Sequence, residues 1–214
     1  MPAFSDSKAQ ATRAAIIDHA LQVASHDGLE SLTMGTLADA LKMSKSGVFN
    51  RVGSRETLQL AVLERYRRRF EAQVLRPAQD ASAGLARLRR LFKMSLEQVG
   101  SSQAGGCFYL SCAAEYDDRL GAVRQELTGG VLAWRAAFSS CVDQARQAGQ
   151  LAADTDGEQF VFETYALLLA VQHDTRLLDR AGSINRALAA FEKLVVQRAV
   201  GAPSMASTSA SVGA

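Results

Sequence analysis

Apolar residues recur along much of the chain at the spacing of one helical face, which predicts a protein built from α-helices. Residues 8–27 and 82–100 show the pattern most clearly. Their apolar faces consist of Ile17, Ala20, Leu21 and Ala24 in the first stretch, and of Leu85, Leu88, Phe92 and Leu96 in the second. Prolines occur only at positions 2, 77 and 203, so long stretches lack the strongest helix breaker. We therefore predict an all-α fold.

Capping residues set the limits of the first four predicted helices. These helices cover residues 8–27, 34–41, 45–51 and 55–76. Thr33, Ser44 and Ser54 each stand directly before a helix, where a short hydroxyl side chain accepts a hydrogen bond from a free N–H group. Gly28 follows the first helix as a left-handed cap, and Pro77 is expected to end the fourth.

Longer helices are predicted in the second half of the chain. We expect them over residues 82–100, 118–148, 156–180 and from 183 onward. Thr155 and Glu158 form a capping-box pattern that opens the third of these, which is strongly apolar. The turn at Gly182 and Ser183 is short, so the last two helices should be antiparallel neighbours. The segment 201–214 is rich in Ser, Ala and Gly and is predicted to be disordered.

Composition and charge narrow the class of protein. The sequence is 48% hydrophobic and 21% charged, which is ordinary for a soluble globular protein. Residues 1–100 carry 15 Lys and Arg against 10 Asp and Glu, whereas residues 101–214 carry 9 against 12. A basic first half suggests a polyanionic partner. No signal peptide is visible and no apolar stretch approaches the roughly 20 residues that cross a bilayer, so we expect a cytoplasmic protein without a membrane partner.

Residues that could carry catalysis or hold a metal ion are sparse. His19, His26 and His173 lack metal-ligand spacing, and no nucleophile elbow or phosphate-binding glycine loop occurs. We therefore expect no enzyme, no cofactor and no metal. The three cysteines, at positions 107, 112 and 141, show no CxxC spacing and are interpreted as reduced thiols, with redox sensing as the alternative.

The basic segment near the N-terminus predicts a helix-turn-helix unit. Two short helices joined by a tight turn, with a longer helix before them, make up this motif, and its second helix enters the DNA major groove. The segment carries Lys42, Lys45, Arg51 and Arg55, and no acid occurs between positions 39 and 56. Charge alone leaves a solvated basic helix in an ordinary bundle as the competing interpretation.

Residues 33–58 resemble the DNA-binding domain of the TetR (tetracycline repressor) family, and the specific resemblance extends over about residues 8–65. The matching positions are Thr33, Leu37-Ala38, Ser44-Lys45, Phe49, Arg51-Val52 and Ser54-Arg55-Glu56-Thr57-Leu58. Three departures from the family pattern involve four positions. Lys42 replaces a turn glycine and Phe49 a tyrosine, while Arg51 and Val52 stand where His-Phe is usual.

The resemblance implies a role for each position of this unit. Base edges would be read by Lys45, Ser46, Gly47 and Asn50. Phosphates would be contacted by Thr33, Lys42, Arg51 and Arg55, with Phe49 at the aromatic position of the interface. The implied organisation is a DNA-binding domain over residues 8–54, a ligand-binding and dimerisation domain over 55–200, and the tail.

The resemblance also implies a repressor that leaves a palindromic operator when a small-molecule effector binds. The homodimer would form through the last two helices, and the apolar run 166–171, with Leu168 on the partner-facing side, supports this. A fully buried helix within one protomer is the alternative. Possible effector-lining residues are Phe92, Phe108, Trp134, Phe138, Tyr165 and His173. Lys42 and Phe49 also leave open a family member whose DNA-binding unit has decayed into a small-molecule-binding or protein-interaction module.

Overall fold

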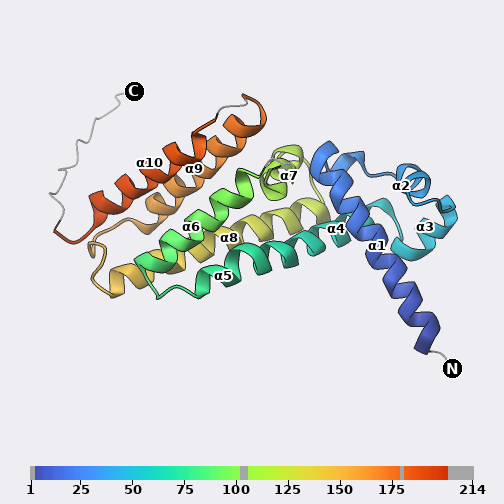
Figure 1. The fold of residues 1–214 in the computed structure, drawn as a ribbon, viewed down its shortest axis with the longest axis horizontal. Coiled ribbons are helices and arrows are strands. Elements are labelled where there is room, and N and C mark those ends of the chain that lie inside the picture. The colour runs from blue at the N-terminus through green and yellow to red at the C-terminus, as the bar shows by residue number, and fades with distance from the viewer. Residues whose placement is uncertain (1–2, 102–105, 179–180, 202–214) are drawn as a thin grey trace.

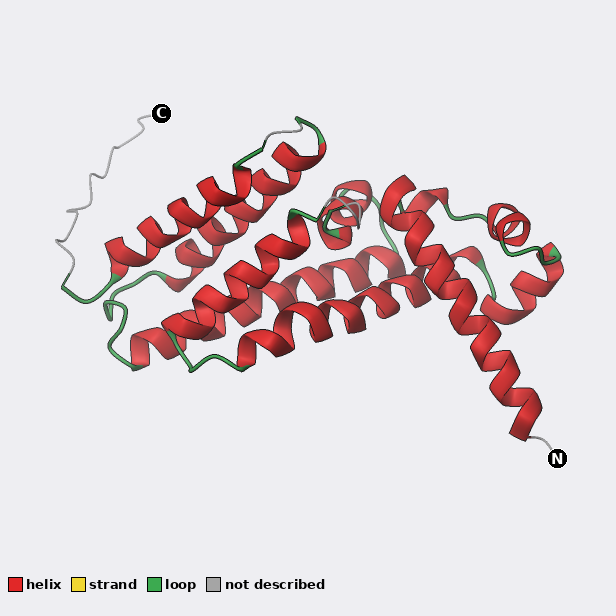
Figure 2. Cartoon of the chain, in the orientation of Figure 1, coloured by secondary structure: helices red, strands yellow, loops and turns green. Residues whose placement is uncertain are grey.

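The computed structural model describes residues 3–101, 106–178 and 181–201, and nearly all of them lie in helices or short loops (Figures 1 and 2). Within these ranges the only strand-like feature is one antiparallel bridge between Leu151 and Ala199. The predicted all-α fold is therefore confirmed. No helix in the described ranges is long and apolar enough to cross a membrane.

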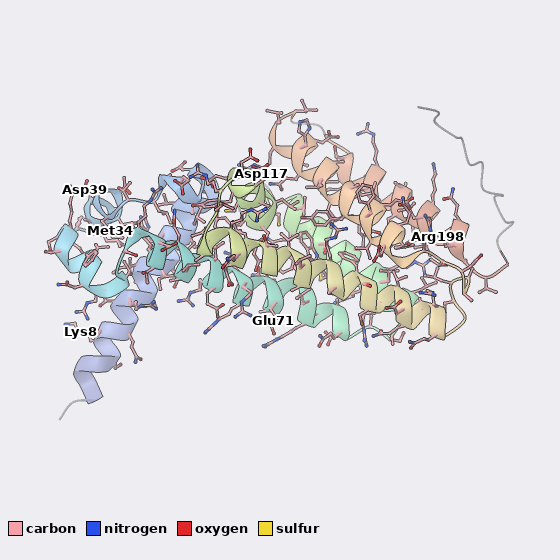
Figure 3. The ribbon with its side chains drawn as sticks, turned by 180° about the vertical axis from the view of Figure 1, so that it is seen from behind. Lys8, Met34, Asp39, Glu71, Asp117 and Arg198 are labelled. Atoms are coloured by element: carbon pink, nitrogen blue, oxygen red, sulfur yellow. The ribbon has the colours of Figure 1, made fainter. Side chains whose placement is uncertain are left out.

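Three N-terminal helices and the start of a fourth form one end of the molecule. They are α1 (Ala3–Asp27), α2 (Met34–Ala40), α3 (Lys45–Val52) and α4 (Arg55–Phe70). The first turns of α1, which carry Lys8, extend beyond the rest of the molecule (Figures 1 and 3). Gly28 has φ 87° and ψ 159°, so the expected left-handed cap is wrong, although the positive φ still favours glycine. The chain leaves Gly28 extended because a short 3₁₀ turn, η1 (Leu29–Ser31), follows at once.

The prediction that Pro77 ends the fourth helix is wrong. α4 continues through a π-helical turn, η2 (Glu71–Leu75), into α5 (Arg76–Gln79), which contains the proline. In the π turn the Arg76 N–H donates to the Glu71 carbonyl, five residues back. A proline lacks an N–H donor and its ring clashes with the carbonyl of the previous turn in a regular helix. The wider turn directly before Pro77 lets the helix continue past it.

The remaining helices form the larger part of the molecule. They are α6 (Leu85–Val99), α7 (Phe108–Tyr116), α8 (Ala122–Gln147), α9 (Gly157–Arg176) and α10 (Ser183–Arg198). α9 and α10 run side by side, joined by a short connection, as predicted (Figure 1). The sequence did not predict α7, because its residues are apolar on most sides and show no helical spacing. The predicted start of α8 at position 118 is wrong, because residue 118 lies in the turn before the helix.

The cap of α9 differs by one residue from the prediction. Asp156 is the N-cap, and its carboxylate accepts from the Gln159 N–H at 3.0 Å. Thr155 is instead buried, with a hydroxyl group that has no hydrogen-bond partner among the described residues. The capping box between Thr155 and Glu158 is therefore wrong, because an aspartate directly after the threonine competes for the same role and is charged.

A single apolar cluster runs through both parts of the molecule. Its largest fully buried side chains are Trp134, Phe92, Phe108, Phe138, Phe160 and Phe191. The rings of Phe92 and Phe191 stack with centroids 4.0 Å apart, which joins α6 to α10. Leu168 is 0% exposed within the single chain. It therefore faces the protomer's own core, and the expectation that it faces a partner is wrong.

Candidate DNA interface

Hydroxyl side chains begin α2 and α3 as the sequence predicts. Thr33 caps α2 through a reciprocal pair of hydrogen bonds with Thr36, a capping box that uses threonine in place of glutamate. Ser44 caps α3, where its Oγ accepts from the Gly47 N–H at 3.0 Å. Both helices therefore begin at fixed points with part of their free N–H groups satisfied.

The turn between α2 and α3 is a Schellman motif. The Lys42 N–H donates to the Asp39 carbonyl at 3.3 Å, and the Met43 N–H donates to the Ala38 carbonyl at 2.9 Å. Lys42 occupies the left-handed position with φ 52° and is the only non-glycine residue in the described ranges with positive φ. A side chain there costs about 1 kcal/mol relative to glycine. The turn therefore contains backbone strain at Lys42, whose side chain is exposed.

α3 separates a buried face from an exposed one. Val48 and Val52 are buried against the core, whereas Phe49 and Asn50 point outward. Phe49 is 54% exposed, so more than half of its surface faces solvent. The exposed positions on or beside this helix include most of the predicted DNA contacts: Thr33, Lys42, Lys45, Ser46, Phe49, Asn50 and Arg51. Gly47 is half-buried beneath Ser44.

Gly35 makes room for one of these basic side chains. A β-carbon placed on Gly35 would lie 3.4 Å from Lys45 Cε and 3.6 Å from its Nζ. The Lys45 side chain therefore lies across the first turn of α2, which brings its amine close to the start of both short helices. The Lys45 amine therefore adds positive charge where the N–H groups of two helix starts already favour an anion.

Arg55, at the start of α4, has partners within the protein. Its Nε donates to the Leu32 carbonyl at 2.9 Å, and its guanidinium pairs with Glu30 at 3.0 Å. Two of its nitrogens therefore hold the 29–32 segment in place. The sequence could not show this, because Glu30 lies far from Arg55 along the chain.

Glu30 is the centre of a polar cluster that joins the N-terminal helices to α7. Its carboxylate accepts from the Tyr116 hydroxyl and from Gln59 Nε2, and it pairs with Arg119 at 3.0 Å. The hydrogen bond from Tyr116 is the main cause that lowers the pKa of Glu30, and Gln59 and the two arginines lower it further against the opposing effect of burial.

Glu115 adds a second connection between the same two parts. Its carboxylate oxygens accept from the Leu29 and Glu30 N–H groups, each at 2.8 Å. These two N–H groups open the η1 turn, so Glu115 caps it from another part of the chain. We call the contacts of Glu30, Arg55, Glu115, Tyr116 and Arg119 the α7 joint.

The residues predicted to line an effector cavity lie in different environments. Phe92, Phe108 and Phe138 are buried in the core, and His173 has a side chain 58% exposed on the surface. Trp134 lines a cavity of about 530 Å³ between α4 and α8. Its indole donates to Ser95 at 3.1 Å, and its ring meets that of Tyr165 edge-on with centroids 5.6 Å apart.

Sequence reasoning missed two glycines that shape this cavity. At Gly130 an added β-carbon would lie 2.7 Å from the ring of Tyr109, so only glycine allows this ring to lie against α8. A β-carbon added at Gly129 would have no other atom within 4 Å. Two adjacent glycines inside a predicted helix cost stability and were a signal of close approach or of a cavity.

The three cysteines are buried within the structure. Cys107, Cys112 and Cys141 are free and buried, and burial raises the pKa of each thiol. Buried thiols with a raised pKa are poor nucleophiles. Among the described residues no group of three or more His, Cys, Asp or Glu side chains could hold a metal ion.

Comparison with known proteins decides the family. The family described as "Tetracyclin repressor-like, C-terminal domain" matches residues 84–191, which is half of the chain. The chain belongs to the TetR family of transcriptional regulators. A comparison with curated proteins gave no match.

Solved TetR-family structures share the fold over nearly the whole chain. A regulator from Chloroflexus aurantiacus J-10-FL aligns with a TM-score of 0.82 at 18% identity, covering 90% of this chain and 98% of that one. A regulator from Cytophaga hutchinsonii aligns with a TM-score of 0.77 at 20% identity, covering 90% and 97%. AibR, in complex with isovaleryl coenzyme A and operator DNA, aligns with a TM-score of 0.66 at 20% identity, covering 87% and 97%.

The three departures from the TetR pattern are compatible with the fold of the unit. Lys42 adopts the positive φ that a glycine would take. Phe49 keeps an exposed aromatic ring without a hydroxyl group, and Arg51 keeps an exposed basic side chain. Val52 fills its core position while 2% exposed. The TetR helix-turn-helix geometry is therefore present despite these changes.

Proposed function

We propose that this TetR-family regulator represses transcription by binding a palindromic operator through α3 and leaves it when a small molecule binds. The observation that carries the proposal is the exposed face of α3. It presents a short amide, small residues and a basic side chain, while Val48 and Val52 anchor the opposite face. An amide can pair with adenine and an amine with guanine at base edges.

We assign contacts to the predicted residues according to where they lie. Lys45, Ser46, Gly47 and Asn50 are proposed to read bases. Lys42, Arg51 and Thr33 are proposed to contact phosphates, and Phe49 to contact the sugar-phosphate surface. Arg55 also remains close to the DNA-facing side, but we propose that it mainly holds the 29–32 segment, because Glu30 and Leu32 already engage two of its nitrogens.

We further propose that the protein is a homodimer through α9 and α10. Large apolar side chains are exposed there, with Phe162 at 60%, Leu169 at 46% and Val196 at 62%. An isologous dimer presents two identical copies of α3, so its operator should be a palindrome or close to one. AibR, of the same fold, was solved with both operator DNA and a small molecule, which supports a regulator that binds both.

Binding to DNA from the intergenic region upstream of the gene tests this function. A variant with Lys42, Lys45 and Arg51 all replaced by alanine should bind far more weakly and with a reduced salt dependence, since each phosphate contact contributes about −0.9 to the slope of log K against log salt. The matched control replaces Arg76, Arg90 and Lys93, three exposed basic residues on α5 and α6, and should bind normally.

Two results would contradict the proposal. One is a folded wild-type protein that binds no sequence in a random DNA library, which would favour an interaction module with a decayed DNA-binding unit. The other is equal binding by the triple variant and the control, which would place the DNA interface elsewhere.

A further inference from the structure

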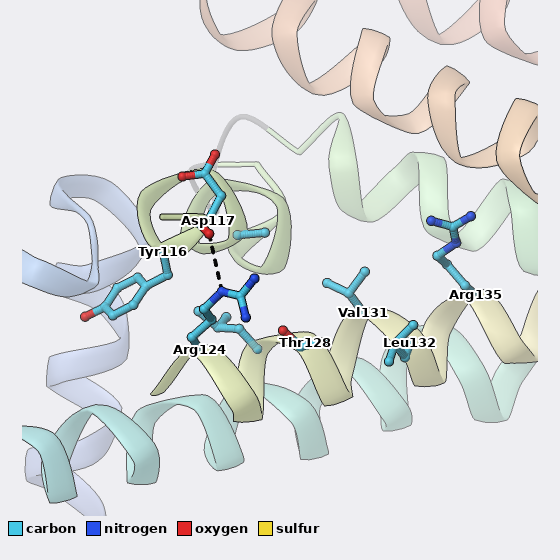
Figure 4. A pocket seen from close by; sticks show the side chains of 9 residues that line it. Tyr116, Asp117, Arg124, Thr128, Val131, Leu132 and Arg135 are labelled. Carbon is cyan, nitrogen blue, oxygen red and sulfur yellow. Dashed lines mark hydrogen bonds between the residues drawn. The ribbon is translucent and has the colours of Figure 1, made fainter. Parts of the chain in front are cut away.

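A groove between α7 and α8 lies beside the α7 joint (Figure 4), and none of the predicted effector residues lines it. We call it the α7–α8 groove. Its volume is about 240 Å³. It is lined by Ala113, Tyr116, Asp117, Arg124, Leu127, Thr128, Val131, Leu132 and Arg135.

The middle of the groove is apolar. Leu127 is buried beneath it, Val131 is half-buried, and Leu132 is 59% exposed at its edge. Figure 4 shows Val131 and Leu132 between two arginines on the same side of α8. Arg124 and Arg135 lie about 16 Å apart along the helix axis at 1.5 Å per residue. The groove is therefore an apolar surface with a cation at each end.

These two arginines lack the ion pairs that many others on this molecule make. Among the described residues neither has a carboxylate within ion-pairing distance, whereas Arg67, Arg89 and Arg198 each pair with a glutamate. Arg124 donates from Nε to the Asp117 carbonyl at 3.3 Å, and the Asp117 side chain lies nearby in the groove. Arg135 is half-buried, and its guanidinium carbon lies 5.3 Å from the centre of the Tyr165 ring.

A half-buried guanidinium without a carboxylate is the feature that selects a ligand. Partial burial of a charge is unfavourable unless an opposite charge compensates it, and the Tyr165 ring compensates only in part. A carboxylate matches the planar guanidinium with two parallel hydrogen bonds. The groove volume corresponds to about eight water molecules at about 30 Å³ each, so a ligand of about eight non-hydrogen atoms fits.

We propose that the α7–α8 groove binds a short-chain carboxylate, with its carboxylate group on Arg135 and its alkyl chain over Val131, Leu132 and Leu127. The proposal rests on the proposed function only for the consequence of binding. The expected consequence of binding follows from the position of the groove beside α7. Ala113 and Tyr116 line the groove from α7, and Tyr116 also donates to Glu30, so an occupant lies against the helix that holds the N-terminal unit. Occupancy should therefore change operator affinity.

Isothermal titration calorimetry with hexanoate, which has the expected size, tests the site at fixed ionic strength. The wild-type protein should bind hexanoate more tightly than acetate, which lacks the chain, and should not bind hexylammonium, which has the opposite charge. Arg135→Gln should weaken hexanoate binding at least tenfold. Arg146→Gln removes the same charge from the far end of α8, where Arg146 pairs with Asp143, and should leave hexanoate binding unchanged.

A second variant tests the groove without changing charge. Ala113→Phe fills it from the α7 side and should also abolish hexanoate binding, while thermal melting confirms that each variant is folded. Equal hexanoate binding by the wild type and Arg135→Gln, stronger binding of hexylammonium, or no hexanoate binding by the folded wild type would each overturn the proposal.

Operator binding is measured on the same samples to separate this site from the proposed function. Operator binding without hexanoate binding would refute the carboxylate site and leave the regulator intact. Hexanoate binding that requires Arg135, in a protein that binds no DNA, would support the site and refute the regulator.

Discussion

Removal of the Glu115 carboxylate should loosen the connection between α7 and the DNA-binding unit. In Glu115→Ala the Leu29 and Glu30 N–H groups, which each donate to this carboxylate at 2.8 Å, lose their acceptor. Hydrogen bonds to a charged group contribute about 1.5–3 kcal/mol each. Glu115 is only half-buried, so water can replace part of the interaction, and we expect the lower end of the range, about 3 kcal/mol in total.

The assay is urea unfolding of the wild type and variants at one protein concentration, because association couples stability to concentration. Glu115→Ala should unfold at a lower urea concentration. Glu115→Gln should be intermediate, since its amide keeps one acceptor oxygen but turns an NH₂ group toward the second N–H. Asp118→Ala, a nearby exposed acid, is the matched control and should match the wild type.

Operator affinity supplies a second readout of the same interaction. A loosened η1 turn gives α2 and α3 more freedom, and DNA binding must then restrict it, so Glu115→Ala should bind operator more weakly. The reasoning is refuted if Glu115→Ala and Asp118→Ala unfold at the same urea concentration, because the two hydrogen bonds would then contribute nothing.

Three further predictions concern single positions. Lys42→Gly should stabilise the fold by about 1 kcal/mol in urea unfolding, because φ is 52° there, and should weaken operator binding; a destabilised variant would contradict the strain at this turn. The lowered pKa of Glu30 means that its contribution to stability is complete above its ordinary pKa of about 4.5 and is lost as the pH falls through the lowered value. Glu30→Gln should therefore be less stable than the wild type at neutral pH but lose less stability between pH 5 and about 3, and parallel pH profiles of the two would oppose this. Leu169→Glu, on the exposed face of α9, should give monomers by light scattering while Leu120→Glu, at a position 95% exposed before α8, should not; a stable Leu169→Glu dimer would place the interface elsewhere.

Local chemistry explains what could be predicted from the sequence. Thr33, Ser44 and Ser54 cap their helices because each cap depends only on a side chain and the N–H groups within the next three residues. The positive φ at Lys42 also follows from a local pattern, the position where the turn requires a left-handed residue.

Other features depend on competition or on distant contacts. Pro77 lies within a helix because a π turn forms before it, and Asp156 takes the cap that Thr155 was expected to form. Periodicity placed Leu168 on an apolar helix but could not say which side faces the protomer's own core.

In the candidate site, too, some features could be predicted from the sequence and others could not. The exposed residues of α3 follow from helical spacing around Val48 and Val52, so the sequence could predict them. The partner of Arg55 could not be predicted, because Glu30 reaches it only through the packing of η1 against α4. The α7–α8 groove also needs two helices in contact, and no local pattern in either helix indicates it.

The central claim is that α3 reads DNA sequence, and selection from an operator library at fixed salt tests it most directly. Asn50→Ala should cost about 1–3 kcal/mol on the preferred operator and relax the preference at one base pair in each half-site. Arg51→Ala should weaken all sequences by about the same factor and flatten the salt slope by roughly one unit for each phosphate that Arg51 neutralises in the wild type. The account is contradicted if Arg51→Ala changes the preferred sequence while Asn50→Ala lowers every affinity equally.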